Sequence, residues 1–420
     1  MLTRPSSVVL DRRTFVKATA AAGIAQFAAP AIIAARGEEP LKIGMVDPLT
    51  GVYAAVAQNE VTGAKLAMDQ INAKGGILGR QIALLVEDSA NDVGTGVQKT
   101  RKLIERDQVT FIIGDVNSAI AQAMAQVTNE KKLLHIVSGG HTDGITGADC
   151  KWNVYRVCNT TRMEANSVSD LLYKQYGKKW HFITPDYAFG HTLQQACADN
   201  LQKLGGTVTG NELTPLGTTD FSAYLIKARA ANPDVLLLLV QGSDMVNCLK
   251  QIVQFGIDKQ IHVAGTQQEL ESLAALPPEA RIGAWMFEWY WKQPDTPHVA
   301  DFVADIRKRN GGKVPTARHW FGFTSMHTFA LVANQEKTLD GLKLAQALGD
   351  FELPAEVKLQ PNKVYYRKGD HQLMTSAFIG AAQQKGADDP DDLFKVDQVV
   401  PGDKTAPPVS ATGCTMQFPA

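Results

Sequence analysis

The sequence predicts an α/β protein of two lobes, each built on a parallel, doubly wound sheet. Short apolar runs alternate with stretches whose apolar residues recur at helical spacing, which is the pattern of strand, helix, strand. Short polar breaks separate these segments, and the same alternation begins again after Cys158. The length of 420 residues also favours more than one unit of ordinary domain size.

The first residues predict an export signal. Arg12 and Arg13 precede a small, Ala-rich apolar run over residues 18–35, as in a signal peptide. The paired arginines followed by Phe-Val-Lys resemble the twin-arginine signal. We expect residues 1–36 to be a twin-arginine-type signal peptide and the mature protein to be soluble and periplasmic. A membrane anchor over the same run is the alternative, although the run is marginal in length and poor in Leu and Ile.

The first predicted lobe begins with an apolar strand at residues 41–46 and a helix on which Ala64, Ala67 and Ile71 share one face. Further elements follow in order: a strand at 81–86, a helix marked by residues 97–104, a strand at 110–113, a helix over 118–127 and a strand at 133–137. The order of these elements is that of a parallel, doubly wound sheet.

The second lobe repeats this order. We expect helices at 164–176, 193–204, 221–230 and 243–255, with strands at 180–184, 207–213, 235–240 and 261–264. An aromatic strand at 285–291 then leads to helices at 298–309, 323–334 and 340–348 and to strands at 364–367 and 373–379. The tail from Gln383 is rich in Asp, Pro and Gly, which predicts irregular structure.

Two polar breaks in the first lobe predict a ligand site. Asn117 and Ser118 start a helix after one strand, and the next strand ends in Ser-Gly-Gly-His-Thr at 138–142. In a parallel sheet both breaks lie beyond carboxyl ends of strands, where such sheets bind ligands. The hydroxyls of Ser118 and Thr142 and the exposed backbone N–H groups form a cradle for an anion, most simply a carboxylate. In the alternative interpretation, Asn117 or Ser118 only caps the helix and the glycines only turn the chain.

The net charge and the positions of the cysteines and histidines argue against nucleic-acid binding and against a metal site, and they allow a disulfide. The formal net charge of -1 and the lack of a Lys/Arg stripe argue against a nucleic-acid partner. Five cysteines in an exported chain leave at least one unpaired, and we favour a disulfide between Cys150 and Cys158. Cys197, Cys248 and Cys414 are equally compatible with buried thiols and with a bridge. No Cys/His cluster has metal-ligand spacing, so we expect no metal site and no cofactor.

The residues resemble a known family, the solute-binding proteins of ATP-driven importers of the branched-chain amino acid type. The matching segments are Ile43-Gly44, residues 47–51, residues 71–80 with Asp88, residues 112–114, the loop 138–142, Asp-Tyr-Ala-Phe-Gly at 186–190 and Thr-Asp-Phe-Ser at 219–222. Their order and spacing carry the match, which covers about residues 41–379.

The resemblance implies the type I periplasmic binding protein fold, with a ligand held between two lobes that are joined by three hinge crossings. It places residues 41–158 and about 290–368 in the N-terminal lobe, and residues 159–289 and about 369–415 in the C-terminal lobe. Binding of a ligand then closes the lobes.

The resemblance also implies which residues bind the ligand. In this family a ligand carboxylate is held by residues matching Ser118 and Thr142, with backbone from Gly140 and His141. Residues after the strands of the second lobe close over the rest of the ligand. The expected ligand-binding residues are Asn117, Ser118, Gly140, His141, Thr142, Phe189, Gln241, Gly242 and Gln267.

One position departs from the family pattern. Binders of α-amino acids usually offer a carboxylate to the ammonium group where this chain has Gln267, and an ammonium buried without an anion is costly. A Gln side chain suits a hydroxyl, amide or carbonyl instead. Glu269 is close in sequence and takes the missing role if the loop is shifted. His141 adds a donor that becomes cationic near an acid, unless it is only a solvated loop residue.

Aromatic residues near the expected cleft favour an aromatic ligand. Phe189 and Tyr187 are candidate walls, together with the tryptophans at 285, 289 and 291, which are equally compatible with core or interlobe packing. Together with Gln267, they lead us to favour a small organic carboxylate over leucine or valine, with aromatic acids among the candidates.

No catalytic pattern accompanies the site. Ser138, His141 and Asp143 lie close in sequence, but a hydrolase triad joins separate elements and no Gly-x-Ser-x-Gly surrounds Ser138. We expect no enzyme, but a monomeric, extracytoplasmic solute-binding component that delivers its ligand to an ABC permease in the inner membrane. Two alternatives remain: a branched-chain amino acid binder of the same transport class, and a sensor that reports a ligand to a signalling partner.

Overall fold

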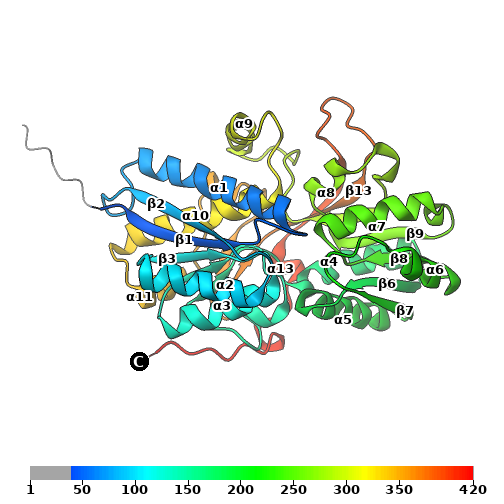
Figure 1. Ribbon diagram of the computed structural model, residues 1–420, viewed down its shortest axis with the longest axis horizontal. Helices are drawn as coiled ribbons and strands as arrows, with labels where there is room; N and C mark the ends of the chain where they lie inside the picture. Colours follow the sequence, from blue (N-terminus) through cyan, green and yellow to red (C-terminus); the bar gives the residue numbers. More distant parts are fainter. Residues whose placement is uncertain (1–38, 420) are drawn as a thin grey trace, which may run out of the picture. The chain divides into compact units, whose positions relative to one another are not determined.

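The computed structural model describes residues 39–419, so the expected signal peptide over residues 1–36 lies outside the described residues. The described chain forms two seven-stranded sheets with helices around them (Figure 1). Each sheet is mainly parallel, with antiparallel pairs only at one edge: β11 with β12 in the first sheet, and β10 with β13 and β13 with β14 in the second. The predicted two-lobe α/β fold is confirmed.

The first sheet contains, in spatial order, β11 (Tyr365–Arg367), β12 (Gln372–Met374), β5 (Val154–Arg156), β4 (His135–Val137), β3 (Phe111–Gly114), β1 (Leu41–Asp47) and β2 (Ile82–Asp88). Its lobe includes the helices α1 (Ala54–Ala73), α2 (Val93–Arg101), α3 (Ser118–Glu130), α9 (Val299–Arg309), α10 (Ala317–Glu336), α11 (Gly341–Leu348) and α12 (Ala355–Lys358). The short helical turns η1 (Lys102–Arg106) and η2 (Asp143–Thr146) complete it.

The second sheet contains, in spatial order, β14 (Phe394–Val400), β13 (Ala377–Ala382), β10 (Ala284–Phe287), β9 (His262–Gln267), β8 (Val235–Leu238), β6 (Lys179–Pro185) and β7 (Thr207–Thr214). Its lobe includes the helices α4 (Thr161–Gln175), α5 (Ala188–Lys203), α6 (Ser222–Ala230), α7 (Gly242–Gln254) and α8 (Leu270–Ala275), with the turns η3 (Ile257–Lys259) and η4 (Pro278–Ala280). The chain ends in α13 (Gly402–Thr405) and η5 (Val409–Ala411).

The core of each lobe follows from the sequence pattern. All four residues of β8 are buried, as expected for an apolar strand with neighbours on both sides and helices on both faces. In the first lobe, Phe111 of β3 stacks on Phe329 of α10, with 4.4 Å between the ring centroids. Glycines let α1 and α10 approach closely, because a Cβ at Gly63 would lie 1.9 Å from the carbonyl oxygen of His319. α1 and α10 lie side by side in Figure 1.

The chain passes between the sheets three times: from β5 to α4, from β10 to α9, and from β12 to β13. The third passage lies at Thr375 and Ser376, because β12 pairs with β5 of the first sheet and β13 pairs with β10 of the second. We expected one strand at 373–379 and a passage near residue 369. The two polar residues Thr375 and Ser376 mark the break, but apolar residues on both sides suggested one continuous strand, because buried strands of either sheet have the same composition.

The tail is more ordered than the sequence predicted. Its β14 pairs antiparallel with β13, so the prediction of irregular structure from Gln383 onward was wrong for this segment. Phe394 is buried beside Phe287 and Tyr290, and this packing fixes the strand despite the Asp- and Pro-rich residues before it.

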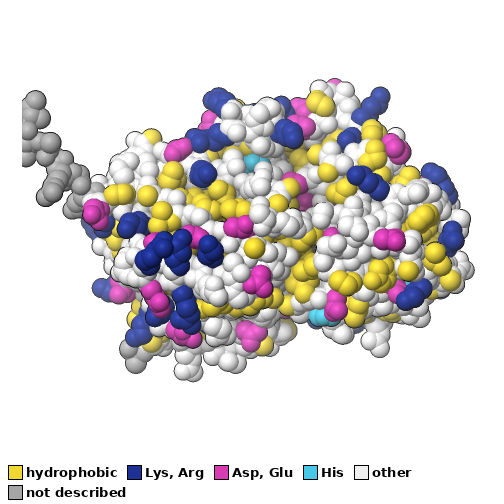
Figure 2. All heavy atoms as spheres, in the orientation of Figure 1, with side chains coloured by type: hydrophobic (Ala, Val, Ile, Leu, Met, Phe, Trp, Pro, Cys, Tyr) yellow, Lys and Arg dark blue, Asp and Glu magenta, His cyan; other side chains and the backbone are white. Residues whose placement is uncertain are grey.

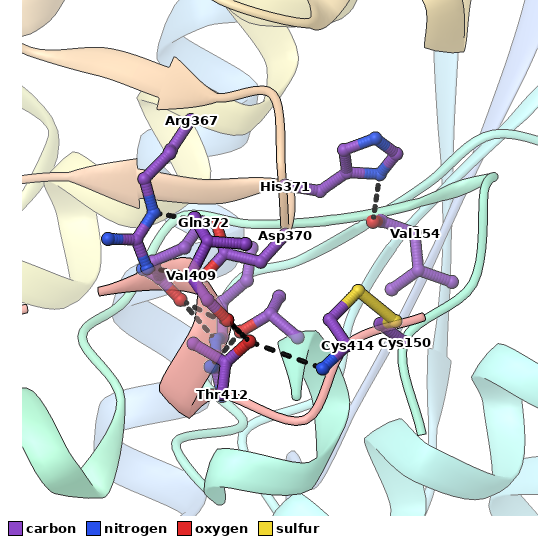
Figure 3. The surroundings of a disulfide bond; sticks show 11 residues. Cys150, Val154, Arg367, Asp370, His371, Gln372, Val409, Thr412 and Cys414 are labelled. Carbon is purple, nitrogen blue, oxygen red and sulfur yellow. Dashed lines mark hydrogen bonds and ion pairs between the residues drawn. A yellow bond between two sulfur atoms is a disulfide. The ribbon is translucent and has the colours of Figure 1, made fainter. Parts of the chain in front are cut away.

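The predicted disulfide between Cys150 and Cys158 was wrong. Cys150 is bonded to Cys414 instead, with 5.6 Å between their Cα atoms (Figure 3). Cys158 is a buried free thiol. The two cysteines of the predicted pair flank β5, and a strand rises about 3.3 Å per residue, so its two ends are too far apart for a disulfide. The bond brings the tail, which leaves the second sheet at β14, back to the first lobe.

Charged side chains of both signs lie on the surface of the described chain (Figure 2). Figure 2 shows basic and acidic side chains interspersed over the face in view. Between residues 39 and 419, no helix combines the length and the apolar character needed to cross a membrane.

Candidate ligand-binding site

A small cavity lies between the two lobes, at the carboxyl ends of central strands of both sheets. Its lining residues are Tyr53, Val116, Ser118, Gly139, His141 and Arg318 from the first lobe, and Tyr187, Phe189, Gln241 and Gln267 from the second. Only about 10 Å³ of it is open to the centre of a water molecule, which is roughly one water site. The lobes are therefore in contact, and a ligand requires them to part.

Polar contacts hold the lobes together around this cavity. The hydroxyls of Tyr53 and Tyr187 lie 2.7 Å apart, and those of Thr142 and Thr192 lie 3.2 Å apart. The backbone N–H of Ser243 donates to the carbonyl of a residue in the loop before α1, at 3.2 Å. An apolar cluster accompanies these contacts, in which Tyr53 and Val116 of the first lobe pack against Tyr187 and Leu216 of the second.

Ser118 joins the two loops of the predicted anion cradle. Its Oγ accepts hydrogen bonds from the backbone N–H groups of His141 (3.0 Å) and Thr142 (3.2 Å). Asn117 is the helix cap, because its Oδ1 accepts from the N–H of Ala119 at 2.9 Å. Asn117 therefore caps α3, whereas its neighbour Ser118 lines the cavity. In this closed structure the backbone N–H groups of His141 and Thr142 donate to Ser118.

A buried arginine, Arg156, holds the loop after β4 by hydrogen bonds to its backbone carbonyls. Arg156 Nη1 donates to the carbonyl of Thr142 at 2.6 Å and to that of Gly140 at 3.2 Å. Its Nε donates to Oε1 of Gln372, which lies on β12 next to the third passage between the lobes. The loop after β4 is therefore positioned by charge-assisted hydrogen bonds rather than by its own sequence.

Arg318 is the cationic group of the first lobe that lines the cavity. Its Nη1 lies 3.0 Å from Oε1 of Glu60, and its Nη2 lies 2.6 Å from Oε1 of Glu269 in the second lobe. Gly139 lets the guanidinium approach the β4 loop, because a Cβ there would lie 2.5 Å from Nη1. Burial opposes the charge of Arg318, but Glu269 and Glu60 outweigh this and raise its pKa.

Carboxyl groups behind the lining outnumber the nearby cations. Burial raises the pKa of Asp47 well above its ordinary value and that of Asp115 to about 8. Burial also raises the pKa of Glu60, against the effect of Arg318, and that of Glu269 to about 7. Part of this buried cluster is protonated near neutral pH, which limits the negative potential that an anionic ligand meets.

His141 faces two further carboxylates. Its Nδ1 lies 2.9 Å from Oε1 of Glu164 and 3.1 Å from Oε1 of Glu288, and all three side chains are buried. Burial lowers the pKa of His141, but Cys158, Glu288 and Glu164 outweigh this and raise it well above its ordinary value. Between residues 39 and 419, this is the group of His and acidic side chains with the geometry of a metal site.

The structure brings most of the predicted site residues to the cavity. Ser118, His141, Phe189, Gln241 and Gln267 line it. The other predicted residues lie beside it: Asn117 caps α3, Gly140 packs on Ala121, Thr142 bridges to Thr192, and Gly242 begins α7 against Val52. Trp285 and Trp289 are core residues, and Glu269 bonds to Arg318 and to Gln267 Nε2.

Sequence reasoning missed Tyr53, Val116, Gly139 and Arg318. Arg318 reaches the cavity from α10, which follows the second passage between the lobes and has no neighbour in sequence among the other lining residues. The available signal was a charged residue at the start of a long helix that is otherwise strongly apolar. The cluster of His141, Glu164 and Glu288 was missed for the same reason, because its members are remote in sequence.

Comparisons with known proteins identify the family. The family described as "Periplasmic binding protein" matches residues 40–387. The chain is 26% identical over 351 residues to Leu/Ile/Val-binding protein homolog 2 of Brucella abortus, covering 79% of this chain and 91% of that protein. These relatives are solute-binding proteins and not enzymes, in agreement with the sequence-based expectation.

Solved structures agree in fold. A periplasmic binding protein from Burkholderia mallei is 26% identical, with a TM-score of 0.83 over 90% of this chain and 99% of that one. A solute-binding protein of an ABC transporter from R. palustris, in complex with benzoate, is 19% identical, with a TM-score of 0.78 over 90% of this chain and 100% of that one. Two mainly parallel sheets, a cavity between them and this family match together show that the chain belongs to the periplasmic binding proteins of ABC transporters.

Proposed function

We propose that this periplasmic binding protein captures a small organic carboxylate without an ammonium group, aromatic in character, and delivers it as a monomer to an ABC permease. The observation that carries the proposal is the charge of the lining. Arg318 and His141 line the cavity, and no Asp or Glu among the described residues does. A ligand carboxylate would be stabilised by this cationic lining, whereas a ligand ammonium group would be buried without an anion in contact.

The uncharged lining supports an aromatic acid that also carries a hydrogen-bond donor. Phe189, Tyr53 and Tyr187 supply aromatic surfaces on both sides of the cavity. The Oε1 atoms of Gln241 and Gln267 are buried and have no hydrogen-bond partner. Buried acceptors are normally satisfied, so these two amides suit a ligand hydroxyl or N–H. The same fold accommodates benzoate in the R. palustris protein.

Capture follows from where the charges lie. The ligand carboxylate docks on the first lobe beside Arg318 and the Ser118 hydroxyl, where each charge-assisted hydrogen bond contributes about 1.5–3 kcal/mol. The second lobe then rotates over it about the three passages and brings Phe189, Gln241 and Gln267 into contact. We propose further that residues 1–36 direct export through the twin-arginine route before this cycle begins.

A branched-chain amino acid is the second candidate, because of one observation. Glu269 is buried next to Gln267, and its Oε2 has no hydrogen-bond partner. A small shift of the loop after β9 would present this oxygen to a ligand ammonium. The relatives named Leu/Ile/Val-binding proteins agree with this candidate.

Pairs of ligands that differ only in the amine separate the two candidates. The mature protein, freed of carried-over ligand by unfolding and refolding, is titrated with 3-phenylpropanoate against phenylalanine and with 4-methylpentanoate against leucine, by calorimetry and thermal shift. We expect the amine-free member of each pair to bind and to raise the melting temperature. Binding to the folded state alone adds about 2.7 kcal/mol at 100 times the dissociation constant. Preference for the amino acids in both pairs would refute the proposal.

A further inference from the structure

Three buried side chains from separate segments converge at the edge of the cavity. His141 lies in the loop after β4, Glu164 lies in the first turn of α4, and Glu288 directly follows β10. The imidazole nitrogen and the two carboxylate oxygens lie within 4.8 Å of one another. The cluster therefore joins the first lobe, the second lobe and the second passage between them.

The atoms that face one another in this cluster lack hydrogen bonds. His141 Nδ1 is within 3.1 Å of both Oε1 atoms, yet neither oxygen is aligned with the ring N–H well enough to accept from it. Nδ1 and the Oε1 atoms of Glu164 and Glu288 are all buried without a hydrogen-bond partner. Two carboxylate oxygens that converge in a buried site require a positive charge beside them, and either a proton on His141 or a bound cation supplies it.

The remaining carboxylate oxygens are held in place. Glu164 Oε2 accepts from the hydroxyl of Thr266 at 2.9 Å, and Glu288 Oε2 accepts from the backbone N–H of Asn159 at 2.7 Å. Each carboxylate is thus fixed through one oxygen and leaves the other free, which is how surrounding groups orient metal-binding carboxylates. Cys158 is not included, because its thiol donates to the carbonyl of Gly140 at 3.4 Å.

We propose that His141, Glu164 and Glu288 bind one divalent metal ion, for which the donor set favours Zn²⁺. One imidazole nitrogen and two carboxylate oxygens are three of the four ligands that Zn²⁺ takes, with one position left for another ligand. The ion would displace the proton of His141 and take its place as the positive charge of the cluster, and a neutral imidazole, two carboxylates and a divalent cation are together uncharged, as a fully buried site requires. The ion would link the two lobes and stabilise their closed arrangement, whatever ligand the cavity takes.

The test is Zn²⁺ binding to the mature protein after removal of metal with EDTA. Calorimetry and elemental analysis are expected to give one equivalent of Zn²⁺ per chain, and Zn²⁺ is expected to raise the melting temperature. Glu164→Gln and Glu288→Gln should each abolish both effects. Thr266→Val, which removes only the orienting hydroxyl, should weaken Zn²⁺ binding by about 10–100-fold.

Glu212→Gln is the matched control. Glu212 Oε1 lies 3.7 Å from Nε2 of His181, a His–Glu contact at a distance from the cluster, so this variant should bind Zn²⁺ as the unaltered chain does. Melting curves in EDTA show whether each variant is folded. The proposal is overturned if the unaltered chain binds no stoichiometric Zn²⁺, or if Glu164→Gln and Glu288→Gln bind it unchanged. Absence of Zn²⁺ binding with a higher melting temperature of Glu164→Gln in EDTA would instead indicate a proton shared by the two carboxylates.

Discussion

Glu269→Gln tests how the cavity receives a negative ligand. Arg318 is shared by Glu60 and Glu269, with 2.6 Å between Nη2 and Oε1 of Glu269. A ligand carboxylate would be a third negative group around one guanidinium. The variant keeps the size of the side chain and an oxygen that accepts from Arg318, and removes one of the competing charges.

The size of the effect depends on pH. Burial raises the pKa of Glu269 to about 7, so this carboxyl is mainly protonated at about pH 6 and mainly charged at about pH 8. At pH 8, one unit above this pKa, protonating Glu269 to remove its charge costs about 1.4 kcal/mol, which is a factor of ten in ligand affinity. We therefore expect the affinity of the unaltered protein for 3-phenylpropanoate to fall about tenfold from pH 6 to pH 8. Glu269→Gln should bind about tenfold more tightly at pH 8 and equally at pH 6.

Calorimetry at both pH values measures the difference, with Glu271→Gln as control. Glu271 also bridges the lobes, since its Oε1 accepts from Asn59 and from Thr316 at 2.7 Å, but it does not bond to Arg318. The control should keep a fall in affinity with rising pH, moved to lower pH, because the charge of Glu271 adds to burial in raising the pKa of Glu269. If Glu269→Gln keeps that pH dependence, or binds the acid no better at pH 8, Glu269 does not compete with the ligand. Leucine binding that Glu269→Gln abolishes would support the amino-acid candidate instead.

Four further outcomes are expected, each measured by urea unfolding. Ser118→Ala should cost about 1–3 kcal/mol, because two loop N–H groups lose their acceptor, and should also weaken ligand binding in calorimetry. Phe111→Ala should cost about 3–5 kcal/mol, because the ring is buried on Phe329, whereas Phe255→Ala at the exposed end of α7 should cost little. Cys414→Ser should cost up to about 5 kcal/mol, because the disulfide spans 264 residues. Stability should fall as the pH rises from about 6.5 to 8, because in this range the buried acids with raised pKa keep protons in the folded chain that the unfolded chain has already lost. The buried histidines with lowered pKa contribute the opposite slope below about pH 6.5, where the unfolded chain protonates them. The acids are Asp115 and Glu269, and the histidines are His135, His319, His327 and His371.

The fold was predictable because its information is local. Alternating apolar runs and helical stripes placed most elements within a few residues: the strand expected at 207–213 is Thr207–Thr214, and the helix expected at 340–348 is Gly341–Leu348. The pattern failed at 373–379, where one apolar stretch contributes β12 to the first sheet and β13 to the second. It also failed at β14, where packing forms a strand although the residues before it are rich in Asp and Pro. β5 was not predicted, because three residues are too few to show a period.

The site was predictable only in part, because its members are positioned by different principles. Ser118, His141, Phe189, Gln241 and Gln267 follow or end strands, so sheet topology and the family resemblance located them. Arg318 depends on how closely α10 packs on α1, which is set by glycines in both helices, and its local signal is only a charge at the start of an apolar helix. The partner of Cys150 depends on the path of the tail, and a bond between residues so far apart in sequence has no spacing rule.

The bond between Cys150 and Cys414 closes residues 150–414 into a covalent ring, and residues 39–149 lead into this ring as a linear segment. The ring contains every strand of the second sheet, since all of them lie between these two cysteines in the chain. A single proteolytic cut anywhere in that lobe therefore leaves two fragments that migrate as one species until a reductant separates them. A protease in the periplasm that nicks an exposed loop of the second lobe would not release either half, and the two sheets would stay tethered for refolding.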